Sequence, residues 1–264
     1  TQNKVIMKRI LLSSLIAAVF ISSCNKNDLN ETKIWDANPA NTSLVKYLNS
    51  YTALTPSIGA PANGPTIDYY INNKKMNATA MAYSGLYPVV GGGFAAAPGG
   101  PVNIKAVLNR PTGGGVASDT IASGSFILGP GVAHSVILVD TLPNPTPFNP
   151  ILMVVQESVS MPAYGFFKLR LMNLVATNEV YELYNSTTAT VVTPGISYKN
   201  LSAWIELPTS TPNSVYQIRL AGTNTVMATA TALTGGNQRS YTFWARGNPS
   251  VTGRTRTLSS YISQ

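Results

Sequence analysis

The chain contains the same succession of strand patterns twice. Each pattern begins with an alternating segment that carries an interior cation and an asparagine near its end. Four segments match in order: 166–175 with 43–52, 178–188 with 65–75 (Val180 to Asn185 aligned on Ile67 to Asn72), 214–223 with 101–110, and 233–247 with 128–142. A repeat of this period predicts two similar domains of about 100 residues each, rather than a solenoid of short units.

The composition of the chain favours strands over helices. Charged residues make up 11% of the sequence, well below the roughly 25% of ordinary globular chains. Strand-forming and turn-forming residues take their place, and no segment beyond residue 24 keeps a helical period. We therefore predict an all-β chain of two tandem immunoglobulin-like β-sandwich domains, at residues 44–160 and 161–264, without the Cys…Trp…Cys core of antibody domains.

The first residues have a different character. Lys8 and Arg9 precede a mostly apolar run from Ile10 to Ile21. This run is shorter than the roughly 20 residues that a membrane-spanning helix needs, and a charged start with a short apolar run is typical of a secretory signal. Its end, Ile21-Ser22-Ser23-Cys24, resembles the bacterial lipobox, which implies cleavage before Cys24 and lipid attachment to that cysteine.

Residues 1–23 are therefore predicted to be upstream residues and a lipoprotein signal peptide, with Met7 as the natural initiator. Residues 24–43 are polar and read as a lipidated tether. Cys24 is the chain's single cysteine, so the lipidated chain has no disulfide and relies on its core for stability. The expected partner is a membrane, reached through the N-terminal lipid. The expected location is the cell envelope, at the outer membrane, on its periplasmic or its exposed side.

Three segments resemble a tandem domain of unknown function found in lipoproteins of Bacteroidota. They are Val45 to Asn49, Ile67 to Asn72, and Gly236 to Phe243, within a similarity that covers residues 44–264. The resemblance implies a fold and an envelope location, and it implies no activity. The second half has Tyr181-Glu182 where this pattern favours an aspartate, which argues against a shared ligand at that position.

Most catalytic chemistry lacks its parts in this sequence. His134 is the only histidine, so a catalytic triad and a histidine zinc site are incomplete. The acids form no calcium loop, and the glycine-rich segment 91–100 is not followed by a phosphate-binding lysine. We expect no cofactor, no metal site and no catalytic residue. A carboxylate-dependent hydrolase, pairing Asp68 with Asp140 or Glu157, stays as an alternative.

A glycan partner is a further alternative. Tyr83, Tyr87, Trp204 and Trp244 are candidates for sugar-stacking platforms, although aromatic residues of sandwiches more often lie in the core. Asp119-Thr120-Ile121 and Asp140-Thr141-Leu142 are similar to the O-glycosylation acceptor of Bacteroidota.

The basic charge does not point to nucleic acid. The cations are scattered, apart from a group near the C-terminus, whereas a nucleic-acid surface needs a dense basic stripe. We interpret that group, Arg239, Arg246, Arg254 and Arg256, as a solvated basic edge. The sequence thus predicts a lipid-anchored, non-enzymatic envelope protein with a binding, adhesion or surface-assembly role and a protein or glycan as its partner. The first alternative is a carbohydrate-binding accessory lipoprotein of a glycan-uptake system.

Overall fold

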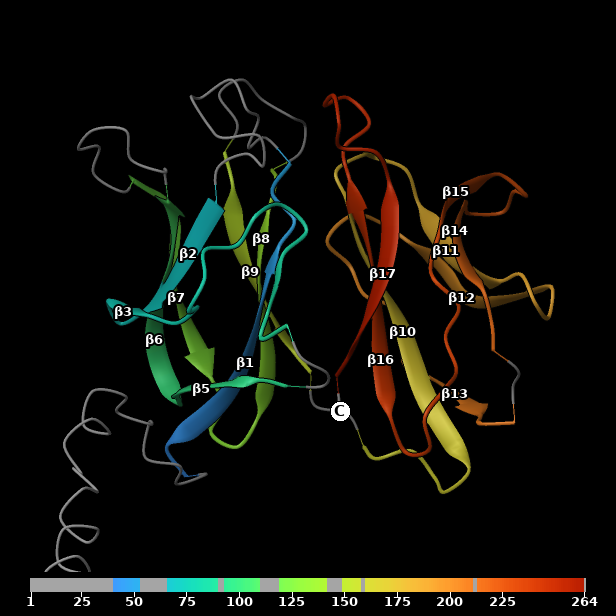
Figure 1. Ribbon diagram of the computed structural model, residues 1–264, viewed down its shortest axis with the longest axis horizontal. Coiled ribbons are helices and arrows are strands. Elements are labelled where there is room, and N and C mark those ends of the chain that lie inside the picture. Colours follow the sequence, from blue (N-terminus) through green and yellow to red (C-terminus); the bar gives the residue numbers. More distant parts are fainter. Residues whose placement is uncertain are drawn as a thin grey trace, which may run out of the picture. The chain divides into compact units, whose positions relative to one another are not determined.

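A computed structural model describes residues 40–52, 66–89, 93–109, 119–141, 149–157, 160–210 and 213–263. The signal segment, Cys24 and the tether up to residue 39 lie outside these residues. The described residues form strands and no helix, arranged in two immunoglobulin-like sandwiches (Figure 1). The predicted all-β fold is therefore confirmed.

The first sandwich consists of two sheets. Sheet A has the order β4-β1-β8-β9, and β5 also pairs with β1. Sheet B has the order β3-β2-β6-β7. The strands are β1 (Thr42–Asn49), β2 (Thr66–Ile71), β3 (Lys74–Lys75), β4 (Leu86–Tyr87), β5 (Ala95–Pro98), β6 (Gly100–Asn109), β7 (Asp119–Leu128), β8 (Ala133–Val139) and β9 (Ile151–Gln156).

The second sandwich repeats this arrangement. Sheet C has the order β13-β10-β16-β17, and sheet D has the order β12-β11-β14-β15. The strands are β10 (Phe166–Val175), β11 (Tyr181–Asn185), β12 (Thr190–Ile196), β13 (Ile205–Pro208), β14 (Tyr216–Leu220), β15 (Val226–Thr229), β16 (Ser240–Gly247) and β17 (Thr257–Ile262). The same central pair is parallel in both sandwiches, β1 with β8 and β10 with β16, while the other pairs are antiparallel.

Each sandwich has its own apolar core. In the first, Val45 and Tyr47 of β1 face Tyr69 and Ile71 of β2 and Val136 of β8. The second is built in the same way from sheets C and D. The turn between β2 and β3 is formed by Asn72 and Asn73, which both adopt positive φ angles of 48° and 66°. Two consecutive positive φ angles are typical of a two-residue hairpin turn, which asparagine tolerates well.

A third apolar cluster lies between sheet A and sheet C. Its buried members are Leu48, Ile137 and Val139 from sheet A, and Met172, Leu174, Trp244 and Tyr261 from sheet C. Both faces of β1 and β10 are therefore covered, which is why nearly all of their residues are buried. The described residues accordingly belong to one compact unit, and a division into separate domains at residues 160–161 stays a prediction.

Candidate functional site

His134 lies inside the first sandwich. Its Nδ1 atom is 3.0 Å from Ser43 Oγ and 3.2 Å from the Val132 carbonyl oxygen, and its side chain is almost fully buried. Burial lowers the pKa of His134, which favours the neutral ring. These two contacts link β1 to the turn before β8, so the geometry gives His134 a structural role.

The three acids of the hydrolase alternative are far apart. Asp68 lies on the outer face of sheet B, where Lys75 Nζ is 2.9 Å from its Oδ2. Asp140 and Glu157 follow opposite ends of the β8–β9 ladder, which runs from His134↔Gln156 to Val139↔Ile151. Glu157 lies opposite Ala133, so seven residue steps, or roughly 23 Å, separate it from Asp140, whereas glycosidase carboxylates lie about 5 to 9.5 Å apart. Asp68 faces away from sheet A, next to whose strands Asp140 and Glu157 lie, so it forms a catalytic pair with neither.

The two tryptophans proposed as sugar platforms are covered. Trp244 is 3% exposed within the third core, and the Arg246 guanidinium lies 4.1 Å from its ring centroid. Trp204 is partly buried and carries the Arg170 guanidinium 4.4 Å from its ring centroid. Trp244 is therefore closed to a sugar, and Arg170 occupies one face of the Trp204 ring.

Glu157 is the centre of a buried polar cluster between sheets A and C. Its Oε2 atom is 2.5 Å from Arg170 Nη2, and its Oε1 atom accepts hydrogen bonds from Ser135 Oγ at 2.6 Å and from Tyr261 OH at 2.7 Å. Burial raises the pKa of Tyr261, and the charge of Glu157 adds to this effect. One carboxylate thus joins the two sandwiches through three partners.

Lys46 adds a second cation to this cluster. Its side chain is fully buried, and its ammonium group lies 4.8 Å and 5.3 Å from the ring centroids of Phe94 and Tyr261. The ammonium group has no hydrogen-bond acceptor within the structure as described. Burial lowers the pKa of Lys46 to about 8, against the opposing effect of Glu157. Lys46 and Arg170 occupy the same register position in the two halves, opposite Ser135 and Thr242.

The C-terminal arginines correct the sequence-based interpretation of a solvated basic edge. Arg246 is 8% exposed, and burial lowers its pKa. Arg254 lies 4.3 Å from the Tyr83 ring centroid and donates from Nε to the Thr52 carbonyl at 3.3 Å. Arg256 pairs with Glu179. Of the four, Arg239 is the one whose side chain is exposed. The composition could not show this, because burial depended on the packing of the second half against the first.

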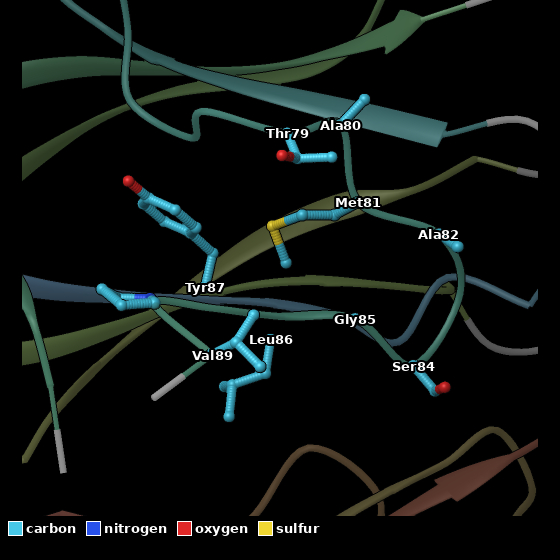
Figure 2. A pocket seen from close by; sticks show the side chains of 10 residues that line it. Thr79, Ala80, Met81, Ala82, Ser84, Gly85, Leu86, Tyr87 and Val89 are labelled. Carbon is cyan, nitrogen blue, oxygen red and sulfur yellow. The ribbon is translucent and has the colours of Figure 1, made fainter. Parts of the chain in front are cut away.

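A mainly apolar cavity lies beside β4 in the first sandwich. It has a volume of about 670 Å³ and is lined by residues between Thr79 and Val89. Figure 2 shows Met81, Leu86 and Tyr87 at this cavity, together with the hydroxyl groups of Thr79 and Ser84. Its size falls within the range of small-ligand sites, which combine apolar walls with a few polar groups. Tyr87 is a predicted sugar platform, whereas the other lining residues belong to no motif and could not be predicted from the sequence.

The other motifs give no site. Within the described part of the chain, no group of three or more histidine, cysteine or acidic residues could hold a metal ion, and no helix long and apolar enough to cross a membrane occurs there. Of the two glycosylation motifs, Thr120 is exposed on β7, whereas Thr141 is partly buried and its hydroxyl donates to the Asn149 carbonyl. Part of the glycine-rich segment, residues 91–92, lies outside the described residues.

Comparisons with known proteins add little to the geometry. No family model and no curated protein matches the chain. Among solved structures, the chain is similar to the Bacillus anthracis TIE protein, with 14% sequence identity and a TM-score of 0.23. The match covers 79% of this chain and 34% of that protein, so the chain spans about a third of its length. A similarity at this level carries no functional argument.

Proposed function

We propose that the chain is a lipid-anchored protein of the cell envelope, of the kind found in Bacteroidota, which binds or assembles with a partner and does not catalyse a reaction. The observation that carries this proposal is the sequence Ile21-Ser22-Ser23-Cys24 at the end of a short apolar run with a basic start. An apolar run of this length is typical of a secretory signal rather than of a membrane-spanning helix. The lipid would be attached to Cys24.

The structure supports a binding role through the state of its ionisable groups. Glu157, Glu179 and Glu206 each have an arginine or lysine partner, and Asp68 pairs with Lys75. Acid–base catalysis needs a titrating group within reach of a substrate, whereas these groups are engaged in contacts that hold the fold. The apolar cavity beside β4 is the best-formed place for a ligand.

Metabolic labelling with a clickable palmitate analogue tests the anchoring. In a Bacteroidota host, the wild-type chain should incorporate the label and fractionate with membranes. Cys24→Ser should lose the label and leave the membrane fraction. Asn25→Ser, a change one residue away, is the matched control and should behave as the wild type. An unlabelled wild-type chain would refute lipid anchoring.

A glycan-binding role is a second candidate, which the position of Tyr87 favours. Its ring is partly exposed, and it lines the cavity beside β4 together with the hydroxyl groups of Thr79 and Ser84. A partly exposed aromatic ring in a cavity that also has polar lining groups is a minimal arrangement for binding a sugar. On a glycan array, the wild type should bind a defined set of glycans that Tyr87→Leu no longer binds. An array without signal for the wild type would contradict this candidate.

A further inference from the structure

Strands β1 and β10 start at the same end of the shared core. Lys46, the fifth residue of β1, lies against the Tyr261 ring, and Arg170, the fifth residue of β10, binds Glu157. These contacts bring the middle of β1 close to the middle of β10.

The last residues of these strands meet at the opposite end. Tyr198 OH donates to the Asp140 carbonyl at 2.7 Å, and Asp140 follows β8, whose Leu138 pairs with Asn49 at the end of β1. The backbone of Lys199 donates to the Asn173 carbonyl near the end of β10. The two strands therefore run in the same direction.

The tether joins the molecule where β1 and β10 begin. The described chain starts at Ala40, two residues before β1. The Asn41 carbonyl accepts a hydrogen bond from the Gly99 amide at 2.8 Å, which places this entry beside the turn between β5 and β6. We call this end of the molecule the tether end. Sixteen residue steps separate Cys24 from Ala40, a reach of at most about 55 Å.

Exposed apolar side chains gather at the tether end. Nine large apolar side chains are exposed among the described residues, and five of them belong to this end. Leu44 is at the start of β1, and Ile127 pairs with Pro101, beside the Gly99–Gly100 turn. The other three lie just before β10 or at its first residue: Met161, Tyr164 and Phe166, with exposed fractions of 62%, 84% and 38%.

The segment that carries Tyr164 is held in place by hydrogen bonds. Gly165, with a φ of +85°, donates from its amide to Asn237 Oδ1 at 2.8 Å. The Gln238 amide donates to the Phe166 carbonyl at 2.8 Å, and Gln238 Nε2 lies 3.4 Å from the Met161 sulfur. An exposed aromatic ring on a fixed turn loses little conformational entropy when it is covered.

The charges at this end are suited to an anionic surface. The acids described here are paired, Glu157 with Arg170 and Glu206 with Lys168 at 3.4 Å. Arg239, next to the turn of Gln238, is exposed and has no ion pair among the described residues. Anionic headgroups attract such cations, and tyrosine side chains favour the boundary between headgroups and acyl chains.

We propose that the tether end is a membrane-contact surface, which rests on the lipid bilayer with Met161 and Tyr164 at headgroup depth and Arg239 against anionic headgroups. This inference rests on the proposed lipid anchor at Cys24. The anchor limits the distance between the bilayer and Ala40. Because β1 and β10 run in the same direction, the segment with Met161 and Tyr164 lies at the same end of the molecule as Ala40. The opposite end, with the chain's Val226 at 46% exposure, then faces away from the lipid.

Fluorescence quenching tests the orientation on the lipidated full chain in vesicles of phosphatidylethanolamine and phosphatidylglycerol. Tyr164→Trp and the matched control Val226→Trp place one added tryptophan at either end, each at an exposed position. Brominated lipids with bromine near the headgroup are the quencher. The emission added by Tyr164→Trp should be lost in brominated vesicles, and that added by Val226→Trp should remain. Circular dichroism should show both variants folded.

Each outcome decides a separate point. Wild-type chain that does not float with the vesicles refutes the lipid anchor, and the inference fails with it. Flotation together with unquenched emission from Tyr164→Trp overturns the membrane-contact surface alone. Emission from Tyr164→Trp that ignores bromine but shifts with protein density identifies a second copy of the chain as the occupant, which also overturns it.

Discussion

Lys46 places a charge in the shared core without a hydrogen-bond acceptor. Its contacts are the faces of Phe94 and Tyr261, and these offset only part of the cost of removing an ammonium group from water. Glu157 does not supply the missing bond, because both of its oxygens already have partners. The charged form of Lys46 is therefore a source of instability in the folded chain.

We predict that Lys46→Met stabilises the protein at pH 7, by about 1 to 3 kcal/mol. The folded-state pKa of Lys46 is about 8, below the roughly 10.4 of an unfolded chain. Between these two pH values, the unfolded state therefore binds more protons than the folded state. As a result, the free energy of unfolding of the wild type increases as the pH rises through this window. The gain from Lys46→Met should thus shrink from pH 7 to pH 10. Urea titrations at several pH values measure it.

The exposed residue Lys74 provides the control for this experiment. Lys74→Met should change the free energy of unfolding little at either pH, because its side chain is exposed on β3. A destabilising effect of Lys46→Met at pH 7, or a gain of equal size at pH 7 and pH 10, would contradict the account of Lys46 as a buried and costly cation.

At the scale of elements, an asparagine near the end of the first strand of each half, Asn49 and Asn173, makes the same type of hydrogen bonds to the backbone. Asn49 donates from Nδ2 to the Met81 carbonyl and accepts from the Tyr51 amide. Asn173 donates to the Ile196 carbonyl at 2.8 Å and accepts from the Val175 amide at 3.0 Å. The buried asparagine side chain thus supplies hydrogen-bond partners to backbone groups at the end of a strand. Without it, these backbone groups would have no partner.

We predict that Asn173→Ala destabilises the protein by about 2 to 4 kcal/mol, because two buried backbone groups lose their partners. Asn200→Ala is the control. It lies in the neighbouring turn, and its side chain bonds only to Ser197 and Tyr198 at the surface, so about 0.5 kcal/mol or less is expected. Urea unfolding compares the two variants, and equal losses would contradict a special role for Asn173.

The elements also show how far a sequence can specify this fold. Ile67, Tyr69 and Ile71 are spaced two residues apart, which is the period of one strand face, and all three lie in the first core. The alignment of Ile67 to Asn72 with Val180 to Asn185, however, is one residue out of phase. Tyr181 and Leu183 face the second core, but the alignment places them on Asp68 and Tyr70, which lie on the other face of β2 from the first core. Residue types alone matched the asparagines, whereas a shift of one residue in a strand exchanges its two faces.

At the scale of the whole molecule, the third core between sheets A and C could not be read from the sequence. Strands with both faces buried lose the contrast between apolar and polar positions, and the sequence could not show which core Trp244 belongs to. The cations of β1 and β10 concealed the contact further, because Lys46 and Arg170 suggest a solvated face. These cations are buried against Glu157 and Tyr261. Glu157 lies more than 85 residues from Lys46 in the sequence, and Tyr261 lies more than 85 residues from both cations.

The third core should make the two sandwiches unfold together. Met172 is fully buried in it, and Met172→Glu would place an unpaired carboxylate between sheets A and C. A loss of about 3 kcal/mol is expected for an uncompensated buried charge, which lowers the Tm by roughly 6 to 12 °C for a chain of this size. Calorimetry should show one transition for the wild type and two separated transitions for Met172→Glu, since the sandwiches no longer stabilise each other.

Met161→Glu, at an exposed position, should keep the single transition and the wild-type Tm. Two transitions in the wild type would mean that the contact between the sheets is too weak to couple the halves, and an unchanged Tm in Met172→Glu would mean that the sheets part without cost.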